Sequence, residues 1–182
     1  MIFVTVGHQM PFDRMVRAID EWAGEHNRND IFAQIGDAKY TPQCIEWVRT
    51  LTPAEFKQRV QAADAIVAHA GMGSILTALQ YGVPILVMPR TAALMETRND
   101  HQIATAKRFK EMGRVHVAMD ENELPAMLDQ VSNLTTGEAI SSQASPELIS
   151  ALAAFIHRAD EKHETREPGA TISDPPGTSK HL

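Results

Sequence analysis

Short apolar runs alternate with amphipathic stretches over the first 131 residues of the chain. The runs at residues 2–6, 31–35 and 65–69 are rich in Ile, Val, Phe and Ala and have the length of buried strands. The stretches between strands repeat apolar residues every three or four positions, which is typical of helices that cover a sheet. Strands separated by such helices predict an α/β fold, a Rossmann-like parallel sheet with helices on both faces.

Local signals mark the ends of several predicted helices. The sequence Thr-Pro-Ala-Glu at residues 52–55 is a capping box with proline at the first helical position, and it starts a helix that runs to about residue 62. Another helix begins around residues 99–102 and stops at Gly113. The other expected elements are helices at residues 13–24 and 124–131 and strands at residues 45–48, 85–88 and 115–118.

The stretch from residue 65 to residue 82 joins a strand, a glycine-containing turn and a helix. Gly71 and Gly73 follow the strand, and Ser74 opens a helical pattern that stops at Gly82. A helix that begins directly after glycines presents unpaired backbone N–H groups and the positive end of its dipole, which favours a phosphate. The geometry of a tight turn also explains two glycines, so the motif alone leaves an anion site and a simple turn both open.

Several other site patterns are absent from the sequence. Leu76 stands where a dinucleotide-binding G-x-G-x-x-G motif needs its third glycine, and no G-x-x-x-x-G-K-[ST] sequence occurs. The chain has no G-x-S-x-G nucleophile motif. Its eight histidines show none of the usual ligand spacings, so no metal site is predicted.

Ligands of parallel α/β sheets bind outside the carboxyl ends of the strands. The loops at residues 7–11, 70–74 and 89–99 are therefore expected to converge at one edge of the sheet. His8 and His69 lie at the carboxyl ends of their strands, where a ring could contact a phosphate or bond a loop carbonyl. We favour ligand contact for His8 and a structural role for His69.

Composition narrows the class of protein. The 182 residues suffice for one domain with a substantial core. The formal net charge is −6 and Lys and Arg are scattered, which argues against a nucleic-acid partner. The single cysteine, Cys44, excludes an internal disulfide framework and suits a reducing compartment. No run approaches the ~18 apolar residues of a membrane span, and we expect a cytoplasmic protein.

Three regions follow from the pattern. Residues 1–134 contain all the alternating elements. Residues 135–159 are a polar link and one more amphipathic helix, which begins near Ser145. Residues 160–182 are polar, rich in Pro and Gly and without periodicity, so we expect a disordered tail.

Three motifs, in order, resemble a known family. MIFVTVGHQMPFDRMV at the start, HAGMGSILTAL in the middle, and GVPILVMPR followed by RNDHQIATA are similar to the carboxyl-terminal, donor-binding domain of GT-B glycosyltransferases of family 28. Within that family the chain resembles the bacterial PssE-type and eukaryotic Alg13-type subunits, and more distantly the second half of MurG. The resemblance covers about residues 1–131 and implies that residues 1–134 are a donor-nucleotide-binding domain.

The resemblance implies where a UDP-sugar would bind. The glycine turn and helix start would receive the diphosphate, the loop after the first strand would approach it, and residues 49–51 would lie near the uracil ring. Relatives often place an acidic residue on the ribose hydroxyls at the position of Thr77, and one hydroxyl cannot replace a two-oxygen acceptor. The residues that this assignment gives to the donor are Gly7, His8, Gln9, His69, Gly71, Met72, Gly73, Ser74, Thr77, Asp100, His101 and Gln102.

The last three of these residues match the family segment that contacts the hydroxyls of the donor sugar. Two of them also have a simpler explanation from the sequence itself. His101, beside Asp100 in the first turn of its helix, could serve only to favour the helix start. Gln102 is the third residue after Asn99 and could complete a capping box.

The resemblance further implies a mechanism and a partner. Backbone N–H groups of Gly73 and Ser74, with His8, would stabilise the charge on the departing UDP without a metal, and no cofactor is implied beyond the UDP-sugar donor substrate. A GT-B enzyme has two such domains. The acceptor half and the catalytic base would therefore come from a membrane-associated PssD-like or Alg14-like subunit, which would hold this chain at the inner face of the membrane beside a lipid-linked sugar acceptor.

The expected function is that of the UDP-sugar-binding subunit of a two-component inverting glycosyltransferase. It would transfer a hexose-type sugar to a lipid-linked acceptor in polysaccharide or exopolysaccharide synthesis. The alternative is a non-catalytic accessory subunit that activates a partner glycosyltransferase, which Thr77 supports. A self-sufficient nucleotide-binding or hydrolase-like domain is disfavoured, because the sequence shows no nucleophile or metal pattern.

Overall fold

The computed structural model describes residues 1–137 and residue 150 of the chain. The first of its two compact units spans Met1–Ser141. The predicted amphipathic helix and the predicted tail lie outside the described residues, apart from Ser150.

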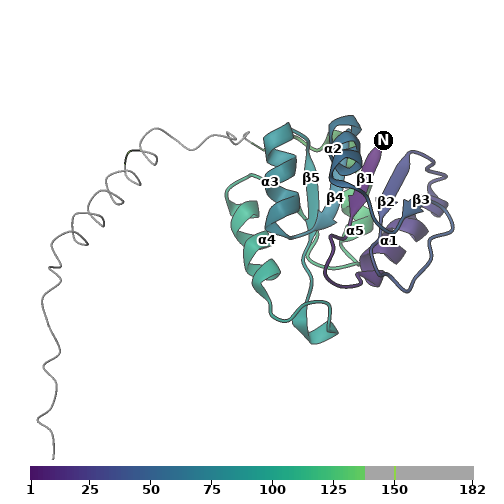
Figure 1. Ribbon diagram of the computed structural model, residues 1–182, viewed down its shortest axis with the longest axis horizontal. Coiled ribbons are helices and arrows are strands. Elements are labelled where there is room, and N and C mark those ends of the chain that lie inside the picture. The colour runs from purple at the N-terminus through teal and green to yellow at the C-terminus, as the bar shows by residue number, and fades with distance from the viewer. Residues whose placement is uncertain (138–149, 151–182) are drawn as a thin grey trace, which may run out of the picture. The chain divides into compact units, whose positions relative to one another are not determined.

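A six-stranded sheet forms the centre of the first unit (Figure 1). Its strand order is β3-β2-β1-β4-β5-β6, and every neighbouring pair is parallel. This is the doubly wound order of Rossmann-like folds, and it confirms the predicted fold class. The strands are β1 (Ile2–Thr5), β2 (Ile31–Gln34), β3 (Glu46–Val48), β4 (Ala65–His69), β5 (Ile85–Met88) and β6 (His116–Val117).

Helices cover both faces of the sheet. On one face lie α1 (Asp13–Glu25) and α5 (Leu124–Leu128), whose buried residues share one hydrophobic cluster. On the other face lie α2 (Pro53–Ala62), α3 (Met72–Tyr81) and α4 (His101–Glu111), whose buried residues belong to a second cluster. Two short 3-10 helices, η1 (Ala92–Leu94) and η2 (Val131–Asn133), complete the elements of the described part.

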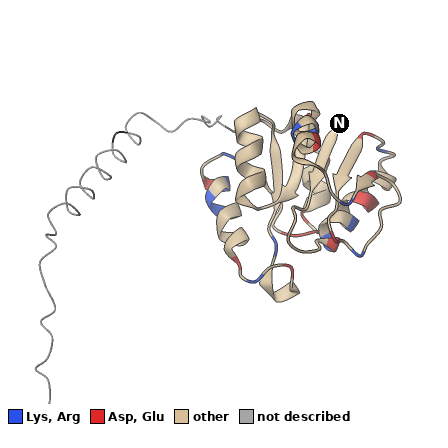
Figure 2. Cartoon of the chain, viewed as in Figure 1, with Lys and Arg blue, Asp and Glu red and all other residues tan. Residues whose placement is uncertain are grey.

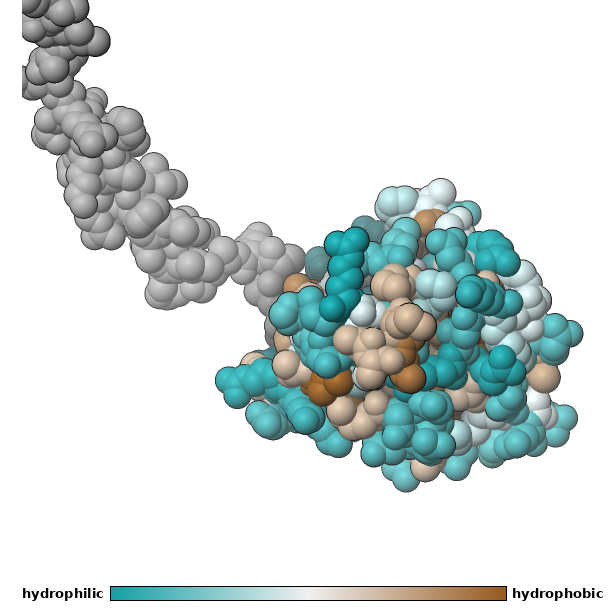
Figure 3. Space-filling model, turned by 90° about the horizontal axis from the view of Figure 1, so that it is seen from below, coloured by the Kyte–Doolittle hydropathy of each residue, from teal (hydrophilic) through white to brown (hydrophobic). Residues whose placement is uncertain are grey.

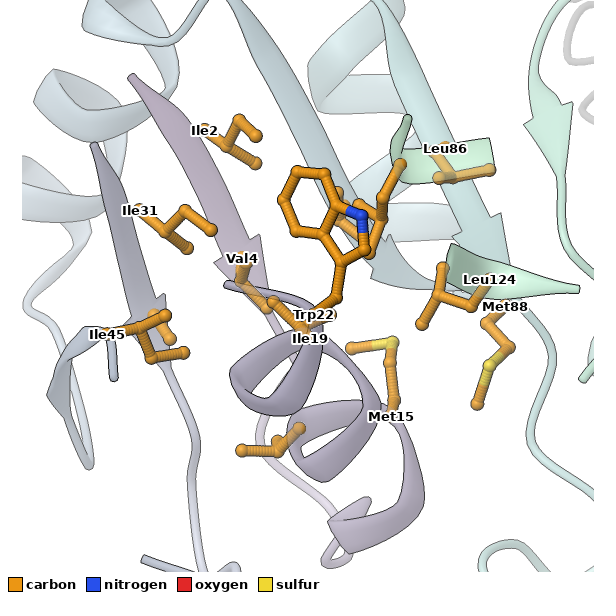
Figure 4. Packing of buried hydrophobic residues seen from close by; sticks show 14 of the residues in the cluster. Ile2, Val4, Met15, Ile19, Trp22, Ile31, Ile45, Leu86, Met88 and Leu124 are labelled. Atoms are coloured by element: carbon orange, nitrogen blue, oxygen red, sulfur yellow. The ribbon is translucent and has the colours of Figure 1, made fainter. Parts of the chain in front are cut away.

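Each strand contributes side chains to both layers of the core, because successive strand residues point to opposite faces. Val4 of β1 lies in the cluster that contains Ile19 and Trp22 of α1 (Figure 4). Its neighbour Phe3 lies in the other cluster, where its ring meets that of Phe56 in α2 at a centroid distance of 5.4 Å. Nearly continuous apolar strands are therefore required for this sheet.

The ends of the elements differ modestly from the sequence-based expectations. The capping box at the start of α2 is confirmed: the Glu55 amide donates to Thr52 Oγ1 at 3.3 Å, and the Thr52 amide donates to the Glu55 carboxylate at 2.8 Å. The strands predicted at residues 45–48 and 115–118 are shorter, as β3 and β6. The helix predicted at residues 124–131 ends at Leu128, before η2.

Charged residues of both signs are spread over α1, α2 and α4 rather than gathered on one element (Figure 2). This distribution agrees with the scattered Lys and Arg of the sequence.

Candidate functional site

The chain adds strands to one side of β1 first and then, from β4 onward, to the other side, so the strand order reverses between β1 and β4. These two strands are neighbours, and β1 pairs with β2 on its other side. Loops after such strands diverge and leave a crevice at the carboxyl edge. The predicted convergence of the loops after β1, β4 and β5 is confirmed, since these strands are adjacent and parallel. Figure 3 views this edge of the molecule, where apolar side chains in brown and tan gather within a polar, teal surrounding.

The crevice contains a cavity of about 640 Å³, which we call the α3 cavity. One end is formed by the amino-terminal turn of α3, and the other by apolar side chains at and before the start of α2. A polar end beside an apolar end suits a ligand that combines an anionic group with a flat ring. The lining residues are Thr5, Gly7, His8, Gln9, Leu51, Pro53, Phe56, His69, Gly71, Met72, Gly73, Ser74 and Thr77.

The first turn of α3 presents unpaired backbone donors to this cavity. The helix begins at Met72, two residues before the predicted start at Ser74, and no side chain caps it. Its first backbone bond is donated by the Ile75 amide to Gly71 O at 3.2 Å. The amides of Met72, Gly73 and Ser74 have no hydrogen-bond partner among the described residues. Three free donors at the positive end of a helix form a cradle for an anion.

The ring of His69 explains two glycines of the site. A Cβ atom on Gly71 would lie 2.2 Å from His69 Nε2, and one on Gly7 would lie 2.6 Å from His69 Cε1. Gly7 also has a φ of 74°, a left-handed conformation that side chains rarely adopt. The imidazole is therefore held between the loops after β1 and β4, and any residue larger than glycine would displace it.

His69 is largely buried and neutral. Burial, helped by the nearby positive charge of Arg90, lowers the pKa of His69 to about 4. Its Nδ1 atom is buried and has no hydrogen-bond partner in the described structure. His69 also lines the cavity. The predicted structural role is thus only part of its contribution, because the ring packs the turn and also faces the site.

Thr77 lines the cavity one turn further along α3, as its predicted contact with ribose requires. Its hydroxyl, however, donates to Gly73 O at 2.7 Å. The proton is used within the helix, so the oxygen can only accept a hydrogen bond from a ligand. The single oxygen of Thr77 is a weaker hydrogen-bond acceptor than a carboxylate, which accepts through two oxygens.

A second cavity, which we call the β5 cavity, adjoins the first and has a volume of about 610 Å³. The two cavities share the side chains of His8, Gln9 and His69, and His8 and Gln9 are exposed. A ligand could therefore extend from one cavity into the other past the loop after β1. The remaining lining residues are Val6, Met10, Arg90, Glu96, Thr97, Arg98, Asn99 and His101.

The predicted sugar-binding segment at the start of α4 is only partly placed at this cavity. His101 lines it, whereas Asp100 and Gln102 are absent from its lining. Asp100 Oδ1 accepts from the Ala92 amide at 2.8 Å, and Gln102 Oε1 accepts from the Arg90 amide at 3.2 Å. The alternative explanation of Gln102, that it completes a capping box, is wrong: α4 starts at His101 without a side-chain cap, and Gln102 is bonded to Arg90 instead.

Sequence reasoning missed two buried polar residues that support the site. Gln34 of β2 accepts from Thr5 Oγ1 at 2.7 Å and donates to Gly7 O at 3.2 Å and to Arg49 O at 2.9 Å. Arg90, which follows β5, is 3% exposed. A polar residue inside an apolar strand or within two residues of its end was the available signal, because burial of such a group requires partners.

Two further properties concern the described residues only. Within residues 1–137 and 150, no three His, Cys, Asp or Glu side chains gather closely enough to hold a metal ion. No helix in that part of the chain is both long and apolar enough to cross a bilayer.

The sheet order defines a Rossmann-like α/β domain, with a crevice at its switch point beside the uncapped start of α3. The chain belongs to the glycosyltransferase family 28 C-terminal domain family, whose model matches residues 1–157. This membership confirms the family resemblance found in the sequence motifs.

Curated relatives carry the name UDP-N-acetylglucosamine transferase subunit ALG13. The protein from Cryptococcus neoformans is 33% identical over 91 residues, which are 49% of this chain and 42% of the fungal protein. The protein from Homo sapiens is 27% identical over 124 residues, 63% of this chain and 10% of the human protein. The chain thus matches less than half the length of either relative.

Solved structures share the fold at low sequence identity. The NMR solution structure of ALG13 aligns with a TM-score of 0.55 and 18% identity over 86% of this chain and 96% of that one. A UDP-GlcNAc 2-epimerase from Neisseria meningitidis, solved with UDP-GlcNAc, also gives a TM-score of 0.55, at 12% identity, over 86% of this chain and 44% of that one. Because a transferase subunit and an epimerase share this fold, the fold alone does not define the chemistry.

Proposed function

We propose that this chain is the UDP-sugar-binding subunit of a two-component inverting glycosyltransferase. It transfers a hexose-type sugar to a lipid-linked acceptor in polysaccharide or exopolysaccharide synthesis. The observation that carries the proposal is the set of unpartnered amides at Met72, Gly73 and Ser74, which open on the α3 cavity at the switch point of the sheet. Family membership supports the transferase chemistry.

The shape of the α3 cavity supports one orientation of the donor. The diphosphate lies against the amides of α3, with His8 and Gln9 beside it, and the uracil ring lies at the apolar end near Leu51 and Phe56. The sugar then extends toward the β5 cavity, where His101 is available. Asp100 and Gln102 serve this arrangement indirectly, through their bonds to the loop after β5.

The chemical step needs little from this chain beyond charge stabilisation. The acceptor hydroxyl oxygen attacks the anomeric carbon, the bond from that carbon to the UDP oxygen breaks, and the bond electrons leave with UDP. The amides of Gly73 and Ser74, the dipole of α3 and His8 stabilise the growing negative charge on the diphosphate. Loss of one well-aimed donor of this kind costs about 2.7 to 4 kcal/mol of transition-state stabilisation.

A partner subunit supplies the rest of the active site. The relatives are named as transferase subunits, which supports a two-chain enzyme. We assign the acceptor site and the base that takes the hydroxyl proton to a membrane-associated PssD-like or Alg14-like chain. That chain holds the present one in the cytoplasm, at the inner face of the membrane, beside its lipid-linked acceptor.

Titration of the chain with UDP, alone and with its partner, tests the proposal. We expect saturable binding that Gly73→Val and Ser74→Ala weaken, because both changes alter the helix end at the cavity. Ser132→Ala is the matched control, since Ser132 is exposed at η2 and lines neither cavity. Absence of UDP binding even with the partner present would refute the donor-binding role.

The second candidate is an accessory subunit that activates a catalytic partner without binding a donor. Thr77 favours this role, because its hydroxyl already donates to Gly73 O and its position lacks the carboxylate that would bind the ribose hydroxyls. Activation of the partner by a Gly73→Val variant that no longer binds UDP would support this role over the first.

A further inference from the structure

Arg90 is a buried cation that joins two loops of the site. Arg90 is 3% exposed and lies two residues after the end of β5. Nη2 donates to Val6 O at 2.7 Å and to Met10 O at 2.6 Å, while Nη1 donates to Pro11 O at 2.6 Å and to Glu96 O at 3.2 Å. Three of these four carbonyls belong to the loop after β1, and the fourth belongs to the loop after β5.

Two of the hydrogen bonds of Arg90 hold the two ends of one loop segment. Val6 and Met10 stand on either side of the segment that contains His8 and Gln9. Arg90 therefore fixes both ends of the segment whose side chains line both cavities. Among the described residues, the only other hydrogen bonds of residues 7–9 are the two that Gly7 forms with Thr5 and Gln34.

Glu96 offsets the positive charge of Arg90 only in part. Its carboxylate favours the charged form of Arg90 but accepts its hydrogen bonds from Arg14 Nε at 2.7 Å and from the Thr91 amide at 3.0 Å. The Arg90 guanidinium forms no ion pair among the described residues and stacks over the ring of Phe12 at 4.6 Å. Burial lowers the pKa of Arg90 to about 10, so the group stays charged at neutral pH.

A buried cation held only by carbonyl groups and a ring favours anions nearby, because the low dielectric of the interior strengthens its field. Arg90 lines the β5 cavity, which His8, Gln9 and His69 connect to the α3 cavity. His69 lines both cavities, and the positive charge of Arg90 contributes to the lowered pKa of its ring.

We infer that Arg90 is a positioning residue of the donor site, which holds the His8–Gln9 segment in place and gives the joined cavities their preference for an anionic ligand. The inference rests on the proposed function, since it concerns binding of the same nucleotide. Arg90 acts through its neighbours and its field. It does not need to touch the ligand.

A series of ligands with rising charge separates this role from simple support of the fold. Uridine, UMP and UDP carry the same ring and sugar and differ in phosphate charge. With Arg90→Met we expect UDP affinity to fall at least tenfold, UMP affinity to fall less, and uridine affinity to change less than threefold. An equal loss for all three ligands, or unchanged UDP affinity, overturns the inference.

Arg90→Lys keeps the charge but replaces the planar four-bond fork with one ammonium. We expect it to retain most of the preference for UDP over uridine while the segment loses order, measured as a lower ¹H–¹⁵N heteronuclear NOE at His8 and Gln9. An unchanged NOE in both Arg90 variants removes the positioning role.

Arg28→Met is the matched control, because Arg28 also stacks on a ring, that of Trp22 at 5.4 Å, but pairs with Asp30 and lines neither cavity of the site. We expect its ligand affinities to equal those of the wild type. Failure of the wild-type chain to bind UDP with its partner present would refute the proposed function itself. Normal UDP binding with no effect of Arg90 would refute only this inference.

Discussion

The ring of His69 determines which residues can surround it. The sequence identified Gly7 and Gly71 as turn residues, and both are confirmed at loops of the site. The reason for glycine was not visible from the motif, because it lies in the packing of an imidazole from β4 against both loops. That packing also buries the Nδ1 atom of His69 without a hydrogen-bond partner. The buried ring is therefore more stable in its neutral form than in its charged form.

We predict that His69 makes stability depend on pH. The pKa of His69 is lowered from 6.5 to about 4 in the folded protein, so between these values the unfolded chain binds a proton that the folded chain does not. The free energy of unfolding should therefore fall as the pH is lowered through this window. At about 1.4 kcal/mol per pH unit, the loss is on the order of 3 kcal/mol.

Urea denaturation of the wild type and of His69→Gln between pH 7 and pH 4 measures this effect. The variant removes the titrating ring, so its free energy of unfolding should decline less steeply toward acid. Parallel curves for the two proteins would mean that His69 does not contribute to the acid sensitivity.

At the scale of elements, the start of α3 shows how local propensity can mislead by two residues. Glycine is unfavourable inside a helix, so the sequence pattern placed the start at Ser74, after Gly73. The helix instead begins at Met72, with Gly71 extended as its N-cap at φ −86° and ψ 140°. Gly73 is therefore a helical residue, and its missing side chain leaves open space beside the free amides.

Substitutions at these two glycines should have opposite effects. We predict that Gly73→Ala stabilises the fold by about 0.5–1 kcal/mol, because nothing lies within 4 Å of the new Cβ and alanine favours a helix. It should weaken UDP binding about tenfold, or ~1.4 kcal/mol, since the methyl group enters the α3 cavity.

Gly71→Ala is the contrasting change, because its Cβ would lie 2.2 Å from His69 Nε2. We expect a loss of about 1–3 kcal/mol in the free energy of unfolding. Thermal denaturation and UDP titration of both variants make the comparison. If Gly73→Ala bound UDP as tightly as the wild type, the diphosphate would not lie at this helix end.

The start of α4 shows a capping signal that tertiary contacts override. Asn99 and Gln102 have the spacing of a capping box, yet Gln102 accepts from the Arg90 amide. Asn99 Oδ1 accepts from the His101 amide at 3.3 Å, which satisfies one donor of the helix start. The spacing of Asn99 and Gln102 thus predicted helix α4 correctly. The capping box does not form, because the Gln102 side chain accepts a hydrogen bond from Arg90, twelve positions earlier.

At the scale of the whole molecule, stability and binding reside in different places. The two hydrophobic clusters lie on the faces of the sheet, and the cavities lie at its carboxyl edge. We predict that Ile19→Ala, at a fully buried position between α1 and the sheet, lowers the free energy of unfolding by about 2–5 kcal/mol (Figure 4).

The affinity of the folded Ile19→Ala protein for UDP should stay within twofold of the wild type, because Ile19 contacts neither cavity. Denaturation gives the first quantity, and titration under conditions where the variant is folded gives the second. A large loss of affinity in the folded variant would show that packing under the sheet controls the site.

The sequence by itself determined the parallel α/β architecture, the order of the elements and the glycine turn, because apolar periodicity, caps and glycine positions are local properties of the chain. Tertiary structure decided the roles of His69, Gln34 and Arg90, and it gave Asp100 and Gln102 their partners. These contacts join loops that are far apart in the chain. Buried polar groups take whichever partners the fold brings to them, and no local pattern encodes that choice.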